Sequence, residues 1–303
     1  MSETAPGKIV VVGSLNLDFV LRVSRMPAAG ETMSAESSAT FSGGKGANQA
    51  VACARMGAEV AMVGRLGDDP AGQMLRGALV AESIDASGVE ATPGVASGAA
   101  AILLTPDGQN RIIIAGGANA RVTPADVAAQ AASFDGAGLL VCQLEVPMET
   151  VAAAAKAAKA RRIAVLLNPA PAVKLSPGLL ADVDYLVPNE TEATLLTGIA
   201  VTDPASATEA AQRLRDQGAG TVIVTLGAAG ILIADGKGAR HLPAPPAKVV
   251  DTTAAGDSFI GGFATGLVEG ADIDRAAKLG LAAARLCVGR EGAQASLPYR
   301  REL

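Results

Sequence analysis

Residue types that carry chemistry in many enzymes are scarce in this chain. It has no tryptophan, two tyrosines and a single histidine, His241, which lies close to several prolines and is expected at the surface. A Ser-His-Asp triad, an H-E-x-x-H metal motif and the H-R-D loop of eukaryotic protein kinases therefore have little or no basis here. Any general base is expected to be a carboxylate.

Clusters of basic residues are also missing. The 303 residues include 25 Lys and Arg against 30 Asp and Glu, a formal net charge of −5. Nucleic acid and anionic membrane are therefore not expected as partners. Cys53, Cys142 and Cys287 lie far apart in apolar segments, which predicts buried free thiols. With no apolar run of about 18 residues and no signal-peptide pattern at the start, the chain is predicted to be cytoplasmic.

The hydrophobic pattern alternates between short strands and helices. Half of the residues are hydrophobic and 18% are charged, so a compact globular protein is expected. Strands are predicted at 8–12, 59–64, 139–144, 163–167 and 221–226, and helices at 71–81, 124–133, 150–160, 257–267 and 276–288. This order predicts an α/β fold with a Rossmann-like, mostly parallel sheet covered by helices on both faces.

Two apolar runs interrupt that alternation. Residues 99–104 and 111–115 flank the sequence Pro-Asp-Gly-Gln-Asn at 106–110, which is typical of a β-hairpin turn. A hairpin inserted between βα units predicts a small β lid.

The sequence Asp-Thr-Thr-Ala-Ala-Gly-Asp at 251–257 comes directly before a predicted helix. The small residues Ala254, Ala255 and Gly256 would leave backbone N–H groups bare at the helix N-terminus, where an anion can bind. Asp257 beside them offers a carboxylate that could accept a proton. The pair indicates phosphoryl transfer to a hydroxyl, although plain helix capping and close packing are the alternative.

Further polar and glycine-rich segments stand where ligands bind in such folds. Residues 43–50 place three glycines around Lys45 before a small-residue helix, without the spacing of a Walker A or dinucleotide-binding loop. Asn16 and Asp18 follow the first strand with alternate spacing, so both could face one ligand, or both could lie in a solvated loop. Glu145 and Asn168 follow other strands at the ligand-binding edge.

The segment Gly-Gly-Lys-Gly-Ala-Asn-Gln-Ala at 43–50 and the segment at 251–257 together resemble the two signatures of the ribokinase (carbohydrate and nucleoside kinase) family. The resemblance covers nearly the whole chain and includes residues 16–18, 143–145, 168–171, 188–192 and 225–227. It implies one domain over residues 1–303, with a β lid formed by about 15–42 and 97–117. Lids of this kind commonly pair between subunits, so a homodimer is implied.

Within the family, the likeness is greatest to members that use ATP to phosphorylate D-ribose at its 5-hydroxyl, giving D-ribose 5-phosphate. The resemblance then makes Asp257 the general base and the amides of Ala254, Ala255 and Gly256 the hole for the transferring phosphoryl group. The residues implied in sugar binding are Asn16, Asp18, Gly44, Lys45, Gly46, Ala47, Asn48, Glu145 and Asp257.

The resemblance also implies an ATP site, Mg²⁺ and a monovalent cation, K⁺. Asn189 and Glu192 would organise the Mg²⁺-nucleotide, although the residues by themselves favour plain helix capping. The residues implied at the nucleotide are Asn189, Glu192, Thr225, Leu226, Gly227, Ala228, Ala229, Gly230, Gly256, Asp257 and Gly280. The residues implied as K⁺ ligands are Asp251, Thr253, Cys287, Arg290, Gly292 and Ser296, with oxygen atoms as donors.

Two positions depart from the family pattern. Gly280 stands where a polar residue near the adenine is expected, and the chain ends at Leu303 without room for a full terminal helix. Two alternative functions stay open beside ribose phosphorylation. One is a kinase of the same family that acts on deoxyribose, fructose or adenosine, and the other is a non-catalytic module that senses a sugar or nucleotide.

Overall fold

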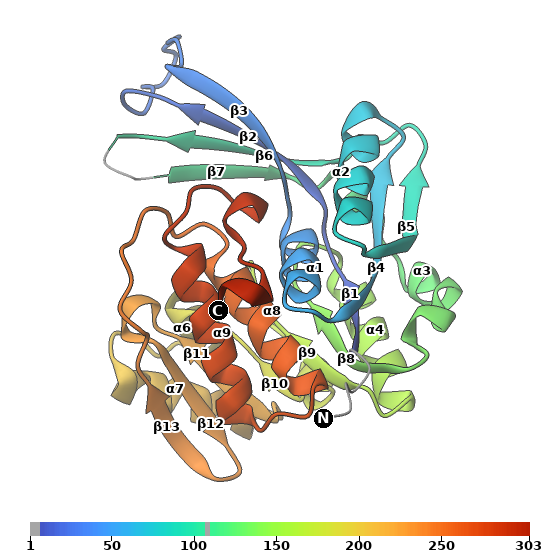
Figure 1. Ribbon diagram of the computed structural model, residues 1–303, viewed down its shortest axis with the longest axis vertical. Coiled ribbons are helices and arrows are strands. Elements are labelled where there is room, and N and C mark those ends of the chain that lie inside the picture. The colour runs from blue at the N-terminus through green and yellow to red at the C-terminus, as the bar shows by residue number, and fades with distance from the viewer. Residues whose placement is uncertain (1–6, 107–109) are drawn as a thin grey trace.

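The computed structural model describes residues 7–106 and 110–303, and within them the strands form two sheets (Figure 1). The larger sheet has nine strands in the order β13-β12-β11-β10-β9-β8-β1-β4-β5. Neighbours are parallel except for the antiparallel pairs β11–β12 and β12–β13. Its strands are β1 (Lys8–Val12), β4 (Glu59–Gly67), β5 (Asp85–Thr92), β8 (Ala137–Cys142), β9 (Ala164–Leu167), β10 (Tyr185–Leu186), β11 (Thr221–Thr225), β12 (Ile231–Asp235) and β13 (Gly238–Leu242).

Both faces of the central strands are buried, and alternate residues of each strand point to opposite sides of the sheet. In β1, Val10 and Val12 join one hydrophobic cluster, whereas Ile9 and Val11 join the other. The first cluster is completed by α3 (Pro124–Ala129), α4 (Met148–Ala160), α5 (Pro177–Ala181), α6 (Glu190–Thr197) and α7 (Pro204–Asp216). The second is completed by α1 (Lys45–Arg55), α2 (Pro70–Ala81), α8 (Ala255–Val268) and α9 (Ile273–Cys287). The predicted helix-covered parallel sheet is confirmed.

The smaller sheet has four strands in the order β3-β2-β6-β7 and projects from one end of the molecule (Figure 1). Its strands are β2 (Asn16–Arg22), β3 (Ser37–Gly43), β6 (Gly98–Leu104) and β7 (Asn110–Ala115). β6 and β7 are antiparallel, as the hairpin prediction requires, although the turn predicted at 106–110 lies partly outside the described residues. Only three residues separate β1 from β2, so the two sheets are joined where the site residues begin.

Several element boundaries differ from those predicted. The helix predicted at 124–133 ends at Ala129 and continues as a separate 3₁₀ turn, and the strand predicted at 139–144 ends at Cys142. Residues Arg300–Glu302 form a 3₁₀ turn, which agrees with the expectation that a terminal helix is short or missing. The 3₁₀ turns are η1 (Gly117–Arg121), η2 (Ala131–Phe134), η3 (Gly227–Ala229), η4 (Gln294–Ser296) and η5 (Arg300–Glu302). In the described part of the chain, no helix combines the length and apolar character needed to span a membrane.

Candidate active site

The polar residues that follow the strands meet at one edge of the large sheet. Asn16 follows β1, Glu145 follows β8 and Asn168 follows β9. Parallel strands place their carboxyl ends at the same edge, where open α/β folds bind ligands. Farther along this edge, Asn189 pairs with Thr225 in an isolated parallel bridge. The residues predicted for the sugar and those predicted for the nucleotide therefore lie along a single edge.

The N-terminus of α8 has the geometry of an anion seat. Ala254 precedes the helix in the left-handed conformation with φ 58°, and no side chain caps the helix. A Cβ built on Gly256 would have no described atom within 4 Å, so the space beside the first turn is open. The N–H groups of a first helical turn lack intrahelical acceptors, and the helix dipole is positive there. Side-chain capping therefore does not account for this segment.

The carboxylate of Asp257 lies in the first turn of α8 and is 6% exposed. Its Oδ2 accepts a hydrogen bond from Asn48 Nδ2 at 3.2 Å, and its Oδ1 accepts one from Gln49 Nε2 at 2.9 Å. Both donors come from α1, which packs beside α8 (Figure 1). Gln49 was not among the predicted site residues. Its place next to Asn48 in the glycine-rich segment was the one signal that could have identified it.

Glu145 holds together the side of the site predicted to bind the sugar. Its Oε2 accepts hydrogen bonds from Ser14 Oγ at 2.6 Å, from the backbone N–H of Lys45 at 3.1 Å and from Asn16 Nδ2 at 3.5 Å. Ser14 Oγ in turn accepts the backbone N–H of Gly46 at 3.2 Å. One carboxylate thus joins the end of β1, the start of β2 and the start of α1. Sequence reasoning missed Ser14, because an isolated serine after a strand is common.

Asn119 fixes the amide orientation of Asn16. Its Nδ2 donates to Asn16 Oδ1 at 2.7 Å and to the carbonyl of Leu15 at 3.0 Å, while its Oδ1 accepts the N–H of Leu15. Asn16 therefore presents its Nδ2 toward Glu145. Asn119 was not predicted either, since it contacts residues about one hundred positions earlier in the chain.

Asp18 is a buried carboxylic group whose charge is disfavoured. Burial, followed by the charges of Glu145 and Asp257, raises the pKa of Asp18 from 3.8 to about 7. Asp18 is two residues after Asn16 on β2, so the two side chains lie on the same face of the small sheet, as predicted. A ligand with hydroxyl donors would supply hydrogen bonds that favour the charged form of this carboxylate.

Lys45 supplies a positive charge to this acidic region. Burial lowers its pKa, but the carboxylates of Asp257, Glu145 and Glu192 outweigh that effect, and the pKa of Lys45 is raised overall. Since Asp257 and Glu145 belong to the sugar side and Glu192 to the nucleotide side, the ammonium group is under the influence of both. It is therefore suited to meet a phosphate group between them.

The backbone of α1 approaches β1 very closely. A Cβ on Gly46 would lie 2.6 Å from the carbonyl carbon of Gly13 and 2.7 Å from the carbonyl oxygen of Ser14. A Cβ on Gly13 would in turn lie 2.8 Å from the Cα of Gly46. Only glycine at these two positions permits this contact, which brings Ala47 and Asn48 to the site. Gly44, with φ 87°, provides the sharp entry into the helix.

On the nucleotide side, Asn189 and Glu192 form a capping box at the start of α6. Asn189 Oδ1 accepts the N–H of Glu192 at 2.8 Å, and Glu192 Oε2 accepts the N–H of Asn189 at 2.9 Å. Burial is the main cause that raises the pKa of Glu192. The two side chains thus cap the helix, and the same hydrogen bonds hold them at the ligand edge.

The segment after β11 forms a compact turn. The N–H of Leu226 donates to the carbonyl of Gly230 at 2.8 Å, and Gly227, Ala228 and Ala229 form a 3₁₀ turn. His241, exposed on β13, lies with its Nε2 2.6 Å from the carbonyl oxygen of Ala229. The end of β11 and this turn therefore carry most of the residues predicted to contact the nucleotide: Thr225, Leu226, Gly227, Ala228, Ala229 and Gly230.

Gly280 lies apart from this turn, within the contact between α8 and α9. A Cβ on Gly280 would lie 2.6 Å from the carbonyl oxygen of Phe259 and 2.8 Å from its ring. Gly280 is buried there, so its role in the structure is close helix packing. A contact between this position and the adenine has no side chain to make it.

The residues predicted to hold a monovalent cation form a connected loop region. Asp251 Oδ1 accepts the N–H and Oγ1 of Thr253 at 2.8 and 2.7 Å, and its Oδ2 accepts the N–H of Gly292 at 2.9 Å. Burial raises the pKa of Asp251, but these hydrogen bonds outweigh it and leave the pKa below its usual value. Cys287 Sγ lies 3.1 Å from Ser296 Oγ and 3.6 Å from the carbonyl of Thr253.

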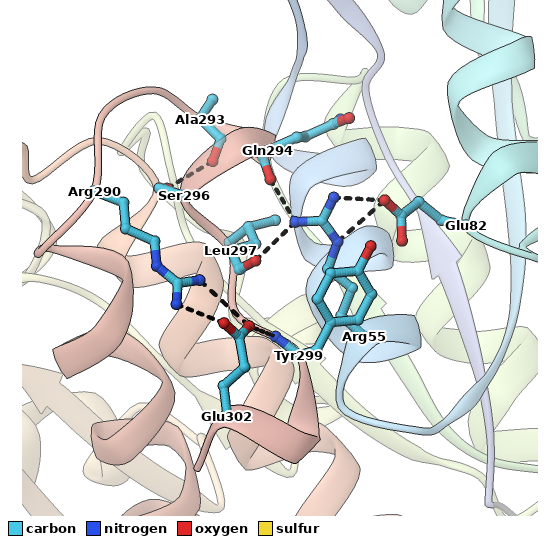
Figure 2. Close-up of polar contacts among 9 residues, drawn as sticks. All are labelled: Arg55, Glu82, Arg290, Ala293, Gln294, Ser296, Leu297, Tyr299 and Glu302. Atoms are coloured by element: carbon cyan, nitrogen blue, oxygen red, sulfur yellow. Dashed lines mark hydrogen bonds and ion pairs between the residues drawn. The ribbon is translucent and has the colours of Figure 1, made fainter.

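Apart from the Cys287 thiol, the donors in this region are oxygens. Besides the Asp251 carboxylate and the Ser296 hydroxyl, they are main-chain carbonyls, a set that suits K⁺ rather than a transition metal. Across residues 7–106 and 110–303, no group of three or more His, Cys, Asp or Glu side chains could hold a metal ion. Arg290 would contribute only its carbonyl, since its guanidinium pairs with Glu302 at 2.7 Å (Figure 2).

Arg55, the last residue of α1, anchors the segment that carries Ser296. Figure 2 shows its guanidinium between Glu82 and the carbonyls of Gln294 and Leu297, each of which accepts from NH1 at 2.7 Å. The guanidinium also lies 4.7 Å from the ring centre of Tyr299. The last residue of α1 therefore holds the loop that is predicted to bind a cation. No sequence motif pointed to Arg55.

Comparisons with known proteins agree with this geometry. A family model described as "pfkB family carbohydrate kinase" matches residues 6–300. A "Ribokinase" of Haemophilus influenzae is 40% identical over 294 residues, which cover 97% of this chain and 96% of that protein. A "Deoxyribokinase" of Salmonella typhi is 38% identical over 291 residues, which cover 96% of this chain and 95% of that protein.

Among solved structures, the chain is similar to the Arabidopsis thaliana ribokinase complexed with ribose and ATP. The TM-score is 0.90 at 35% sequence identity, and the match covers 98% of this chain and 97% of that one.

Proposed function

The chain belongs to the pfkB family of carbohydrate kinases, and on that basis we propose that it transfers the γ-phosphoryl group of ATP to the 5-hydroxyl of D-ribose. The observation that carries the proposal is the position of Asp257, in the first turn of an uncapped helix and linked by Asn48 to the glycine-rich segment. The products are D-ribose 5-phosphate and ADP.

The chemistry follows from this arrangement. Asp257 accepts the proton of the 5-hydroxyl as the new O–P bond forms and the bond from the γ-phosphorus to the leaving ADP oxygen breaks. The amides of Ala254, Ala255 and Gly256 would face the charge that develops on the transferring group, and the Ala255 N–H also donates to the carbonyl of Thr252 at 3.2 Å. Lys45, which interacts electrostatically with Asp257, Glu145 and Glu192, adds a positive charge near the base. Phosphoryl transfer needs positioning and charge stabilisation above all, and these residues contribute to both.

Sugar recognition rests on Asn16, Asp18, Asn48 and Glu145, together with the backbone of residues 44–47. A site made of several polar groups penalises any analogue that lacks a hydroxyl, because partners are then left unpaired. The hydrogen bonds that already fix Glu145 and Asn16 support a preorganised site. The deoxyribokinase among the relatives makes deoxyribose the second candidate acceptor.

Two cations belong to the proposal. Asn189 and Glu192 would hold the Mg²⁺-nucleotide, and Mg²⁺ would offset the charge of the β- and γ-phosphates. Asp251, the hydroxyl of Ser296 and the carbonyls of Thr253, Cys287, Arg290 and Gly292 would hold K⁺. The all-oxygen donor set supports this assignment.

We also propose a homodimer formed through the small sheet. Phe19 is 45% exposed and Ile113 is 71% exposed, and both occupy the same row of this sheet, through Ala101 between them. Exposed large apolar residues in one row of a sheet favour burial against a second copy. The three buried, free cysteines suit a reducing compartment, so we place the enzyme in the cytoplasm.

The test is ADP release with Mg²⁺-ATP, measured separately with D-ribose, deoxyribose, fructose and adenosine, in K⁺ and in Na⁺. The proposal expects the highest kcat/KM with ribose, a higher rate in K⁺, and a loss of at least about 1,000-fold in Asp257→Asn. A higher value with another acceptor refutes ribose. Near-normal turnover in Asp257→Asn refutes the assigned base, and turnover with none of the acceptors supports a sensing module.

A further inference from the structure

A chain of buried amides reaches the proposed base from inside the protein. Gln49 is fully buried in α1, and its Nε2 donates both to Asp257 Oδ1 at 2.9 Å and to Asn168 Oδ1 at 3.1 Å. Its Oε1 accepts a hydrogen bond from Gln143 Nε2. Both amide hydrogens of Gln49 and its oxygen are thus in use, and Asp257 is one of three partners.

The orientation of the Gln49 amide is determined by its neighbours. Asn168 donates its own Nδ2 to the carbonyl of Val187 at 2.9 Å, so it can offer Gln49 only its oxygen. If the Gln49 amide were reversed, its oxygen would face both the Asp257 carboxylate and that Asn168 oxygen. Three acceptors without a donor would then be buried together, which costs several kcal/mol. The backbone carbonyl of Val187 therefore fixes the direction of the whole chain.

The hydrogen-bonded row of amides leaves one buried polar atom unpaired. Gln143 Oε1 is buried and has no hydrogen-bond partner within the described structure. A buried amide oxygen left unpaired costs about 1 to 3 kcal/mol. An apolar residue at position 143 would avoid that cost, so the polar chain is not explained by stability alone.

We propose that Gln49 is a positioning residue that holds Asp257 Oδ1 and thereby sets the direction of the carboxylate toward the acceptor hydroxyl. Gln49 is fully buried, so it reaches the base from the interior of the protein. The inference rests on the proposed function, because it needs Asp257 to be the base. Loss of the Gln49 donor lets the carboxylate rotate, which lowers the chemical rate and leaves sugar affinity almost unchanged.

The experiment compares kcat and the KM for ribose in Gln49→Met and in a matched control, Thr150→Val. Methionine keeps the unbranched shape of glutamine and removes the donors. Thr150 is also fully buried and has one side-chain hydrogen bond, to the carbonyl of Val122 at 2.8 Å, but it lies on α4. Thermal unfolding measures the loss of stability in each variant, and the rate of Thr150→Val then shows how far such a loss by itself affects kcat.

We expect Gln49→Met to lower kcat by about 10- to 100-fold with a ribose KM within about 3-fold of the wild type. Thr150→Val should keep kcat within about 3-fold. If Gln49→Met does not fold, Gln49→Asn, which keeps an amide but withdraws the donor by about 1.5 Å, should give the same pattern. A wild-type kcat in the variant that folds, or an equal loss in Thr150→Val, overturns the proposal.

A double variant separates this inference from the proposed function. In the Asp257→Asn background, Gln49→Met should lower the residual rate by less than about 3-fold, because the group that it positions is already disabled. An equal loss in both backgrounds means that Gln49 acts independently of Asp257, which overturns the inference. If Asp257→Asn itself retains the wild-type rate, the assigned base is wrong, and the fault lies with the proposed function.

Discussion

Without ligand and at neutral pH, the wild-type protein should be less stable than the variant Asp18→Asn. The folded-state pKa of Asp18, about 7, lies above the value of 3.8 expected when unfolded. The unfolded chain therefore loses its proton first as pH rises, and the free energy of unfolding falls between about pH 4 and pH 7. Asp18→Asn has no such charge, so its advantage over the wild type should grow across this range and remain constant above it.

The size of the effect follows from the same two values. At about 1.4 kcal/mol per pH unit, the interval from 3.8 to about 7 gives a ceiling of about 4 kcal/mol. Relaxation of the protein and solvent around the buried carboxylate lowers this ceiling, and we expect about 2 kcal/mol at pH 8. That corresponds to a rise in Tm of roughly 4 °C. At pH 4 the two proteins should differ little.

The assay is urea unfolding at pH 4, 5, 6, 7 and 8 without ligand, with the exposed Asp216→Asn as the control. Ribose turnover by Asp18→Asn should fall at the same time, because the amide replaces one acceptor oxygen with an NH₂ donor that cannot accept a hydrogen bond from a sugar hydroxyl. If the advantage of Asp18→Asn stays the same from pH 4 to pH 8, or if Asp216→Asn shows the same trend, the burial argument is refuted.

Two further predictions concern the contacts of Arg55 and the exposed face of the small sheet. Arg55→Met should lower the free energy of unfolding by about 2 to 4 kcal/mol in denaturant titrations, because Glu82 and two carbonyls lose their buried donor. Arg275→Met, which breaks an ion pair that is largely exposed, should cost less than about 1 kcal/mol, and equal losses would contradict the anchoring role. Ile113→Asp should reduce the mass measured by light scattering from that of a dimer to 30.0 kDa. Val80→Asp on α2, also at an exposed position, should not, and a wild-type monomer would remove the dimer proposal.

The main features of the fold could be predicted because they depend on local patterns. Alternating apolar runs predicted β1, β8 and β9, and small residues before an apolar stretch predicted the start of α8. β5 was missed, since the edge strand Asp85–Thr92 needs few apolar residues and reads as a polar loop. The helix predicted at 124–133 was too long, because its last part continues as a 3₁₀ turn.

The candidate site was only partly predictable, for a different reason. Asn16 and Glu145 stand out because polar residues directly after buried strands are conspicuous. Ser14, Asn119 and Gln49 do not, because each acts through a partner that is far away in sequence. Such supporting contacts depend on how the elements pack, which no spacing along the chain records. Sequence therefore indicates the groups that meet the ligand better than those that hold them.

The close contact between Gly13 and Gly46 affects how this site can be explored experimentally. Truncation to alanine tests what a side chain contributes, and at these two positions there is nothing to remove. Alanine there adds a carbon where the two main chains already touch, at less than 3 Å from the nearest atoms. A truncation scan would therefore rank polar residues such as Glu145 and overlook the positions that set their spacing. Enlarging one atom at a time would reveal them.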